Sequence, residues 1–171
     1  MASLAISALS TQAIQYSDQD LFLENGQPVK LGSTRTWYEG TFNIAEDGYN
    51  PTTHQVSSAV VMFAFGDDND SAYEEVSVDL GLVEGAFGKQ FNVLTLFGGD
   101  LKIGLVQDLS ADGILNYKIN MESGDFYLGY ASLVAQATVR PQNAVPDGGA
   151  TAALLGLGLL GLSVIRRKMR S

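Results

Sequence analysis

Residues 75–80 read EVSVDL, and the alternation in this stretch decides the fold class. Val76, Val78 and Leu80 fall on one side of an extended chain, and polar residues fall on the other. Such alternation predicts a β-strand with one buried face. Upstream, residues 55–65 read QVSSAVVMFAF, an apolar run that suits a buried strand.

Further strands are predicted on both sides of these two. Residues 36–44 are rich in aromatic side chains and partly alternate in polarity. In residues 91–97 the alternation places four side chains on one face, namely Phe91, Val93, Thr95 and Phe97. Residues 114–120 and 126–139 complete the set, whereas residues 101–110 fit either a strand or a short helix.

Glycine, asparagine and aspartate mark the turns between these strands. Asn25-Gly26 lies between the apolar residues 21–23 and 29–31, which predicts a short hairpin. About seven short strands separated by such turns, with no long helical period before Ala150, predict an all-β fold. We therefore expect an antiparallel β-sandwich, with a closed barrel as the alternative.

The composition narrows the classes of site and partner. The chain of 171 residues has no cysteine, which excludes disulfides and thiolate zinc sites. Four of its ten cations lie in the last six residues, so the rest of the chain carries six cations and all 19 acids. The resulting net charge of −13 repels phosphate backbones, and we expect no nucleic-acid partner.

The chain divides into four predicted segments. Residues 1–13 (MASLAISALSTQA) resemble the end of a signal peptide with a small-x-small cleavage site, although the basic n-region is missing. We expect a truncated signal peptide there, with a short first strand as the alternative. Residues 14–140 are the predicted sandwich, residues 141–149 a linker with two prolines and two glycines, and residues 150–171 a membrane tail.

The tail has the order of a transmembrane helix followed by a basic stop. Residues 148–165 are an uncharged run of 18, which as a helix covers about 27 Å, close to the ~30 Å hydrocarbon core. The basic stop is Arg166, Arg167 and Lys168. Cations beside a span stay cytoplasmic, so the acidic body is expected outside. The alternative, a buried helix of a soluble domain, fits poorly because the segment has no polar face.

A sorting motif precedes this span, and it consists of Val145, Pro146, Asp147, Gly148 and Gly149. Together, motif and span resemble a PEP-CTERM sorting domain, in the variant where Val-Pro-Asp replaces Val-Pro-Glu-Pro. The same tail is sometimes labelled an ice-binding protein C-terminal domain, a label that does not imply ice binding. Residues 42–51 and 66–68 are similar, more weakly, to β-rich domains found ahead of such tails.

The resemblance implies export through the general secretory route and the inner membrane of a Gram-negative bacterium. It also implies an exosortase as partner, which would recognise the chain and cleave it near Val145 to Asp147. A membrane-anchored intermediate would then become a protein of the cell envelope or the extracellular space. The family is associated with exopolysaccharide and biofilms, so exopolysaccharide is a candidate partner.

The densest acidic cluster offers a candidate metal site. Residues 66–71 read GDDNDS, and two glutamates follow closely. Carboxylate and amide oxygens crowded on one loop suit Ca²⁺, which takes six to eight oxygens. The expected ligands are Asp67, Asp68, Asp70 and Glu74. The spacing is not that of an EF-hand, and a solvated turn without metal is the alternative. No other cofactor is expected.

No catalytic residue is predicted. His54 is the only histidine and is interpreted as an exposed loop residue, and no Gly-x-Ser-x-Gly elbow is present. Trp37 in its strand is interpreted as core. We therefore expect a non-enzymatic envelope or matrix protein, the alternatives being a secreted carbohydrate-binding module and a small glycan hydrolase. An exposed aromatic strip favours the first alternative, and a cleft with two facing carboxylates favours the second.

Overall fold

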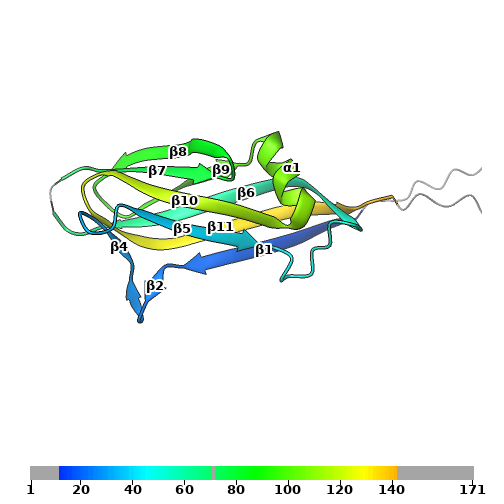
Figure 1. Cartoon of the computed structure of the whole chain (residues 1–171), viewed down its shortest axis with the longest axis horizontal. Coiled ribbons are helices and arrows are strands. Elements are labelled where there is room, and N and C mark those ends of the chain that lie inside the picture. The colour runs from blue at the N-terminus through cyan, green and yellow to red at the C-terminus, as the bar shows by residue number, and fades with distance from the viewer. Residues whose placement is uncertain (1–11, 71, 142–171) are drawn as a thin grey trace, which may run out of the picture. The chain divides into compact units, whose positions relative to one another are not determined.

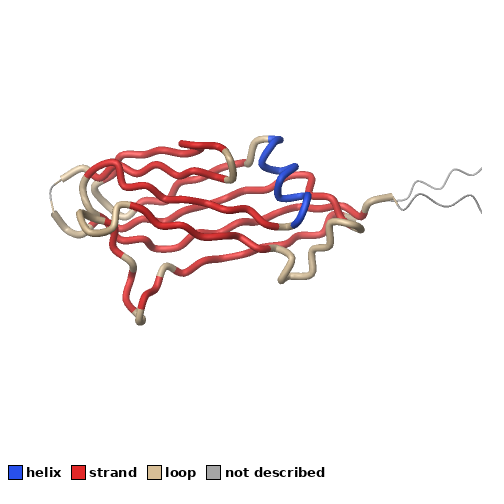
Figure 2. Tube along the Cα trace, viewed as in Figure 1, coloured by secondary structure: helices blue, strands red, loops and turns tan. Residues whose placement is uncertain are grey.

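Strands account for most of the residues that the computed structural model describes, which are residues 12–70 and 72–141. In chain order they are β1 (Ala13–Leu21), β2 (Leu23–Glu24), β3 (Gln27–Pro28), β4 (Lys30–Leu31), β5 (Trp37–Asn43), β6 (His54–Asp67), β7 (Glu74–Leu80), β8 (Val83–Phe91), β9 (Thr95–Asp100), β10 (Ile114–Ser123) and β11 (Phe126–Val139). A helix, α1 (Ile103–Asp112), separates β9 from β10, as Figure 2 shows. All of these elements lie in the first of two compact units, Met1–Arg140 and Pro141–Ser171.

Two antiparallel sheets carry the long strands and lie one over the other (Figure 1). One sheet has the order β1-β11-β6-β9, with the short β4 paired to β11, and the other has the order β5-β10-β7-β8. The hairpin of β2 and β3 stands apart from both. The prediction of an all-β antiparallel sandwich is therefore confirmed for the described part of the chain.

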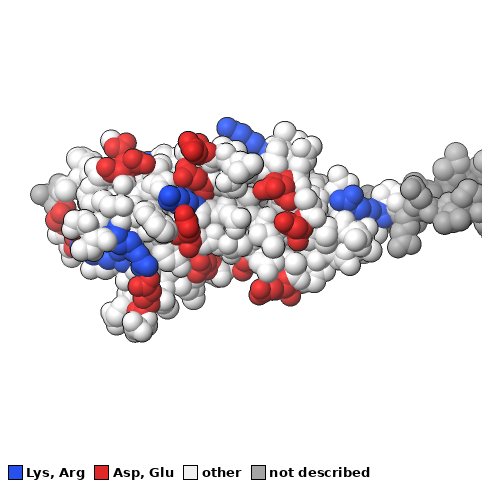
Figure 3. Space-filling view, in the orientation of Figure 1, with Lys and Arg blue, Asp and Glu red and all other residues white. Residues whose placement is uncertain are grey.

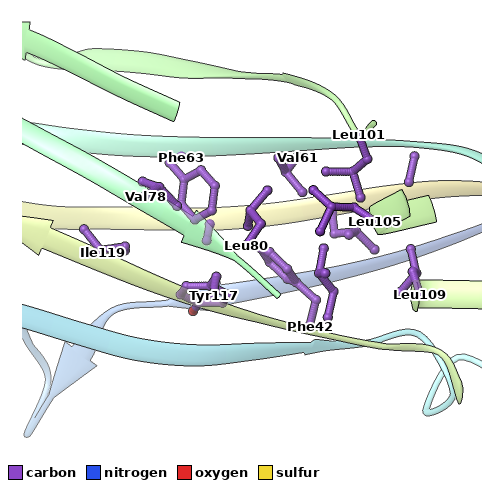
Figure 4. Packing of buried hydrophobic residues seen from close by; sticks show 14 of the residues in the cluster. Phe42, Val61, Phe63, Val78, Leu80, Leu101, Leu105, Leu109, Tyr117 and Ile119 are labelled. Atoms are coloured by element: carbon purple, nitrogen blue, oxygen red, sulfur yellow. The ribbon is translucent and has the colours of Figure 1, made fainter. Parts of the chain in front are cut away.

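The hydrophobic core fills the space between the two sheets. Val76, Val78 and Leu80 are buried, as the alternation of β7 predicts. From the other sheet, Phe63 of β6 meets the ring of Tyr117 of β10 edge to face, with 5.6 Å between the ring centroids. Figure 4 shows side chains of both sheets pointing into this space, with leucines of α1 beside them. Burial of this apolar surface is the main stabilising contribution to the fold.

At one end of the sandwich the chain passes from one sheet to the other four times. β4 leads to β5, β6 to β7, β8 to β9, and β10 to β11. The strand registers place these crossings together, because Asp67 pairs with Phe126, and Glu74 with Phe91. The helix α1 packs on β6 and β10 at the opposite end (Figure 1). β11 therefore runs the length of the sandwich, about 45 Å for its 14 residues.

One predicted strand is wrong. Residues 91–97 do not form a single strand, because β8 ends at Phe91 and β9 begins at Thr95. The three residues between them carry the chain from the edge of one sheet to the edge of the other, and Val93 is 63% exposed. Alternation in sequence cannot distinguish a strand that continues from two strands on different sheets, because both keep a period of two.

Other local predictions have clear outcomes. Residues 101–110, which fit a strand or a helix, contain α1. The Asn25-Gly26 hairpin is confirmed, since these two residues have φ angles of 53° and 77° and connect β2 to β3. β1 and β8 are not among the predicted strands. Both are edge strands rich in polar residues or glycine, so they lack a clear apolar pattern.

No helix among residues 12–70 and 72–141 is long and apolar enough to span a membrane. The predicted span and basic stop at residues 150–171 lie outside the described residues, as does the linker from residue 142 onward. Residues 1–11 of the predicted signal peptide also lie outside them. Ala13, the last residue of that predicted segment, begins β1 and pairs with Thr138 of β11.

Candidate functional site

The four predicted metal ligands come together at the end of the sandwich where the chain changes sheets. Asp67 is the last residue of β6, Glu74 is the first of β7, and Asp68 and Asp70 lie between them. One carboxylate oxygen from each lies within 4.8 Å of one from each of the others. The cluster therefore joins the ends of two strands that belong to different sheets.

Local hydrogen bonds orient two of these carboxylates. The backbone amide of Asn69 donates to Oδ2 of Asp67 at 3.1 Å, and that of Ala72 donates to Oδ1 of Asp70 at 2.6 Å. Asx turns of this kind fix a short acidic side chain against its own backbone. Each of the two carboxylates keeps a second oxygen outside this bond.

Glu74 has an unusual environment for a carboxylate. It occupies the inward-facing series of β7 with Val76 and Val78, and its side chain is 0% exposed. Neither of its oxygens has a hydrogen-bond partner among the described residues. Burial raises the pKa of Glu74, the nearby backbone amide of Asp125 lowers it in part, and the charges of Asp70, Asp125 and Asp67 raise it further. An unpaired charge in such a place costs several kcal/mol, so this carboxylate calls for a proton or a cation.

A lysine from a distant part of the chain meets one side of the cluster. Nζ of Lys30 lies 2.8 Å from Oδ2 of Asp68 and 2.7 Å from Oδ2 of Asp125. Hydrogen bonds to Asp125 and Asp68 raise the pKa of Lys30, and the bond from Lys30 lowers the pKa of Asp68. No signal in the sequence identifies Lys30 or Asp125 as members, because the sandwich brings them to Asp68 from β4 and from the β10–β11 turn.

The β10–β11 turn closes over Glu74 at a glycine. Gly124 has a φ of 78°, and a Cβ placed on it would overlap the Glu74 carboxylate, at 2.5 Å from Cδ. Glycine is thus required here for two reasons, the positive φ and the close approach of Glu74. The sequence pattern Ser123-Gly124-Asp125 indicates a turn, but it gives no sign of the carboxylate beneath it.

The substitution Gly124→Ala is expected to destabilise the protein more than a positive φ alone explains. The left-handed backbone costs an L-residue about 1 kcal/mol, and displacement of the buried Glu74 side chain from its rotamer adds about 1 kcal/mol or more. Denaturant unfolding of the full-length chain in detergent measures the loss. The matched control is Gly26→Ala, where φ is 77° and nothing lies within 4 Å of the added Cβ. Equal losses for the two variants would contradict the placement of Glu74.

Two further sequence interpretations are wrong. His54 begins β6 rather than lying in an exposed loop, and its Nδ1 lies 3.4 Å from the Tyr16 hydroxyl in a half-buried cluster with Tyr49. Trp37 is not core, because its side chain is 50% exposed and Nζ of Lys118 lies 5.1 Å from its ring centroid. Both residues begin a strand, and Trp37 begins an edge strand. Their exposure depends on this position in the sheet rather than on the type of residue.

Acidic side chains also lie on the outer face of the four-stranded sheet, interspersed with a few cations (Figure 3). A surface hollow of about 620 Å³ there is lined by Glu39, Asp79 and Glu84, among others. Asp79 accepts hydrogen bonds at both oxygens, from the Gly85 backbone amide at 2.6 Å and from Asn120 Nδ2 at 2.8 Å. Its carboxylate therefore holds the β7–β8 turn and the neighbouring strand together.

Comparisons with known proteins give weak structural similarities for most of the chain and a motif match for the tail. No curated protein matches the chain. A solved family 35 carbohydrate-binding module from Clostridium thermocellum is 12% identical, with a TM-score of 0.39 over 71% of this chain and 90% of that one. Dimeric latent PorU from Porphyromonas gingivalis is also 12% identical, with a TM-score of 0.44 over 84% of this chain but only 15% of PorU. At these low TM-scores neither likeness supports an inference about this chain.

The tail, in contrast, matches a described motif. The profile of the VPDSG-CTERM motif matches residues 144–169, a range that contains the predicted sorting motif and the basic stop. Gly148 stands where the name of the motif has serine. Residues 144–169 of this chain therefore carry a VPDSG-CTERM motif, a variant of the PEP-CTERM sorting tail.

Proposed function

We propose that this chain is an exported protein of the cell envelope or extracellular matrix, with a non-enzymatic β-sandwich body and a tail that directs its sorting. The observation that carries this proposal is the VPDSG-CTERM motif at residues 144–169. The motif supports export and a membrane-held stage. The Gram-negative host, the exosortase and any contact with exopolysaccharide are parts of the proposal.

The charges of the chain support one orientation in the membrane. Arg166, Arg167 and Lys168 follow the uncharged run directly, and cations at the end of a span are retained in the cytoplasm. The residues before the span carry the excess of acids, which the positive-inside rule does not retain. The sandwich is therefore proposed to lie on the outer side of the inner membrane.

The motif itself is proposed as the site where an exosortase acts. Pro146 biases Val145 toward an extended backbone, which an enzyme can bind in its active site. Cleavage there would release the sandwich from its membrane anchor and leave the span behind.

The body is proposed to act without catalysis. The hydroxyls of Tyr16 and Thr53 surround His54, at 3.4 and 3.3 Å from its Nδ1, so no acid orients the imidazole at that nitrogen. Asp79 uses both oxygens for structural hydrogen bonds in the surface hollow. These arrangements support a structural or binding role better than general acid–base chemistry, which needs a free proton acceptor within reach of a substrate.

A cysteine reporter tests the proposed orientation. The chain has no cysteine, so Leu82→Cys creates a single thiol at a side chain that is 100% exposed on the sandwich. We expect a membrane-impermeant maleimide to label this variant in intact spheroplasts of the native host with its exosortase gene deleted, where the anchor is kept, to the same extent as after permeabilisation. Labelling is read on a gel after capture of the protein.

Two controls measure the background labelling and the integrity of the inner membrane. The parent chain gives the background because it has no thiol. A cytosolic protein with an exposed cysteine must be labelled only after permeabilisation, which proves that the inner membrane is intact. If Leu82→Cys is also labelled only after permeabilisation, the sandwich is cytoplasmic and the proposed function fails.

A further inference from the structure

Glu74, the first residue of β7, is fully buried at one end of the sandwich. Two other parts of the chain meet it there, namely the end of β6 with the loop that follows it, and the β10–β11 turn. We propose that this end of the sandwich binds one Ca²⁺ ion, with Asp67, Asp68, Asp70 and Glu74 as carboxylate ligands. The proposal concerns the body alone and does not depend on the sorting tail.

The cluster holds several carboxylate oxygens that are buried and have no hydrogen-bond partner in the described part of the chain. Four carboxylate oxygens are buried without a hydrogen-bond partner among the described residues, and they belong to three side chains: Asp67 Oδ1, Asp68 Oδ1, and Glu74 Oε1 and Oε2. Buried polar atoms in folded proteins are almost always paired, so four such oxygens in one cluster indicate a missing positive partner. Glu74, 0% exposed, is the most demanding of the three.

Lys30 does not supply that partner for Glu74. Its ammonium contacts one oxygen of Asp68 and one of Asp125, on the outer side of the cluster. Among the described residues, the other carboxylates form no ion pair with it. With Lys30 counted against the five carboxylates, four negative charges remain when all are ionised. A divalent cation bound by the inner oxygens would remove half of this excess.

The neighbourhood explains why water alone would not suffice. Phe91 pairs with Glu74 in the sheet, and Phe126 pairs with Asp67. The rings of Phe91 and Phe126 are buried and lie 5.4 Å apart, so both strand partners of these ligands are apolar. Gly124 closes the other side, where even a methyl group would overlap Glu74. Charges close to apolar walls attract a cation more strongly than charges in water do.

The ligand set and its spacing select calcium among the common ions. All four ligands are carboxylate oxygens, the hard donors that Ca²⁺ and Mg²⁺ prefer over softer metals. An ion that bonds oxygen at roughly 2.3–2.6 Å can share ligands about 5 Å apart, whereas Mg²⁺ at roughly 2.0–2.1 Å reaches only about 4 Å. The four oxygens all lie within 4.8 Å of one another, a spread that Ca²⁺ can bridge. Mg²⁺ also keeps its waters, which a site beside buried phenylalanine residues disfavours.

The position of the site predicts what bound calcium does. Asp67 belongs to the five-stranded sheet and Glu74 to the four-stranded sheet, so one ion coordinated by both would tie the two layers together. The chain has no cysteine with which to form a covalent link. Calcium is therefore expected to stabilise the folded sandwich and to stiffen the end at which these four crossings between the sheets lie.

The test is thermal unfolding of the full-length chain in detergent, followed by circular dichroism. Samples contain EDTA, CaCl₂ or MgCl₂ at 0.1–10 mM. When free Ca²⁺ exceeds Kd about 100-fold, Tm is expected to rise by about 5 °C or more, and Mg²⁺ is expected to produce a smaller rise. Isothermal titration of the same protein with CaCl₂ is expected to give one site per chain.

Substitution of the buried ligand separates a site from general charge screening. Glu74→Gln keeps the shape of the side chain and is expected to abolish the rise in Tm. Glu84→Gln, the same change at an exposed glutamate on β8, is expected to leave the rise intact. If Glu74→Gln does not fold, Asp70→Asn at an exposed loop position replaces it, with at least a tenfold weaker response to calcium expected.

Three results would overturn the proposal. The first is a Tm for the parent chain that does not change between EDTA and 10 mM CaCl₂. The second is a response of Glu74→Gln, or of Asp70→Asn, equal to that of Glu84→Gln. The third is an equal rise with Mg²⁺ and Ca²⁺ that titrates with several sites, which is the behaviour of a screened acidic surface. In each case Lys30 and a protonated Glu74 would be the only compensation within the cluster, and three negative charges would be left to the solvent.

Discussion

The full-length chain is expected to sediment with membranes, and a chain that ends at Ala144 is expected to remain in the supernatant. The difference rests on residues 148–165, an uncharged run that as a helix almost matches the thickness of the hydrocarbon core. Its Leu, Ile and Val residues each favour insertion by about 0.3–0.6 kcal/mol at the centre of a span. Ultracentrifugation of cell lysates, with immunoblotting of both fractions, measures the distribution.

A matched pair of variants tests whether insertion, rather than aggregation, causes the sedimentation. Leu157→Arg places a charge near the middle of the run, at a cost of about 2.5–3.5 kcal/mol, and is expected to move much of the protein out of the membrane. Leu157→Ile keeps the apolar character and is expected to behave like the parent. Recovery of the full-length chain entirely from the soluble fraction, without detergent, would refute the assignment of the tail.

In a host that has an exosortase, the mature protein is expected to lack the span and the basic tail. The motif at residues 144–169 supports recognition by such an enzyme, and a proline at position 146 disfavours the helical conformation for the residue before it. Asp147→Ala is expected to leave the chain uncut, because it removes the charge of the Val-Pro-Asp signature. Asn143→Ala, outside the matched range, is the control and is expected to be processed normally. The two variants differ in one measurable property, the mass of the product.

Much of the fold is visible in the sequence because side chains in a sandwich alternate between core and solvent. β7 and the first part of β10 show this alternation, and β6 and β11 have long apolar stretches. The hairpin at Asn25-Gly26 is visible for another reason, since these two residues favour the positive φ angles that its turn adopts. Local chemistry and burial act in the same direction at these places.

The sequence predictions fail where the tertiary structure, rather than the local sequence pattern, determines the conformation or the exposure of a residue. The alternation over residues 91–97 is real, yet the chain changes sheets in the middle of it. The edge strands β1 and β8 pair with one neighbour only and need little apolar surface, so their sequences resemble loops. Trp37 looks like a core residue by type, but it starts an edge strand and is half exposed.

The acidic cluster, too, is predictable from the sequence only in part. The sequence identifies Asp67, Asp68, Asp70 and Glu74 because they are close neighbours along the chain. It cannot show that Glu74 faces the core, since that depends on the register of β7 beside β8. Nor can it show that Lys30 and the turn at Gly124 surround the cluster, because these contacts join segments far apart in the chain.

Intact-mass spectrometry of the protein purified from an exosortase-containing host decides whether the tail is a processed sorting signal. We expect a product that ends close to Val145–Gly149 and is lighter than the full chain by at least residues 150–171. We also expect that Asp147→Ala yields the uncut mass while Asn143→Ala yields the short one. A population in which every chain retains Arg166, Arg167 and Lys168 would contradict the claim that this tail is a processed sorting signal.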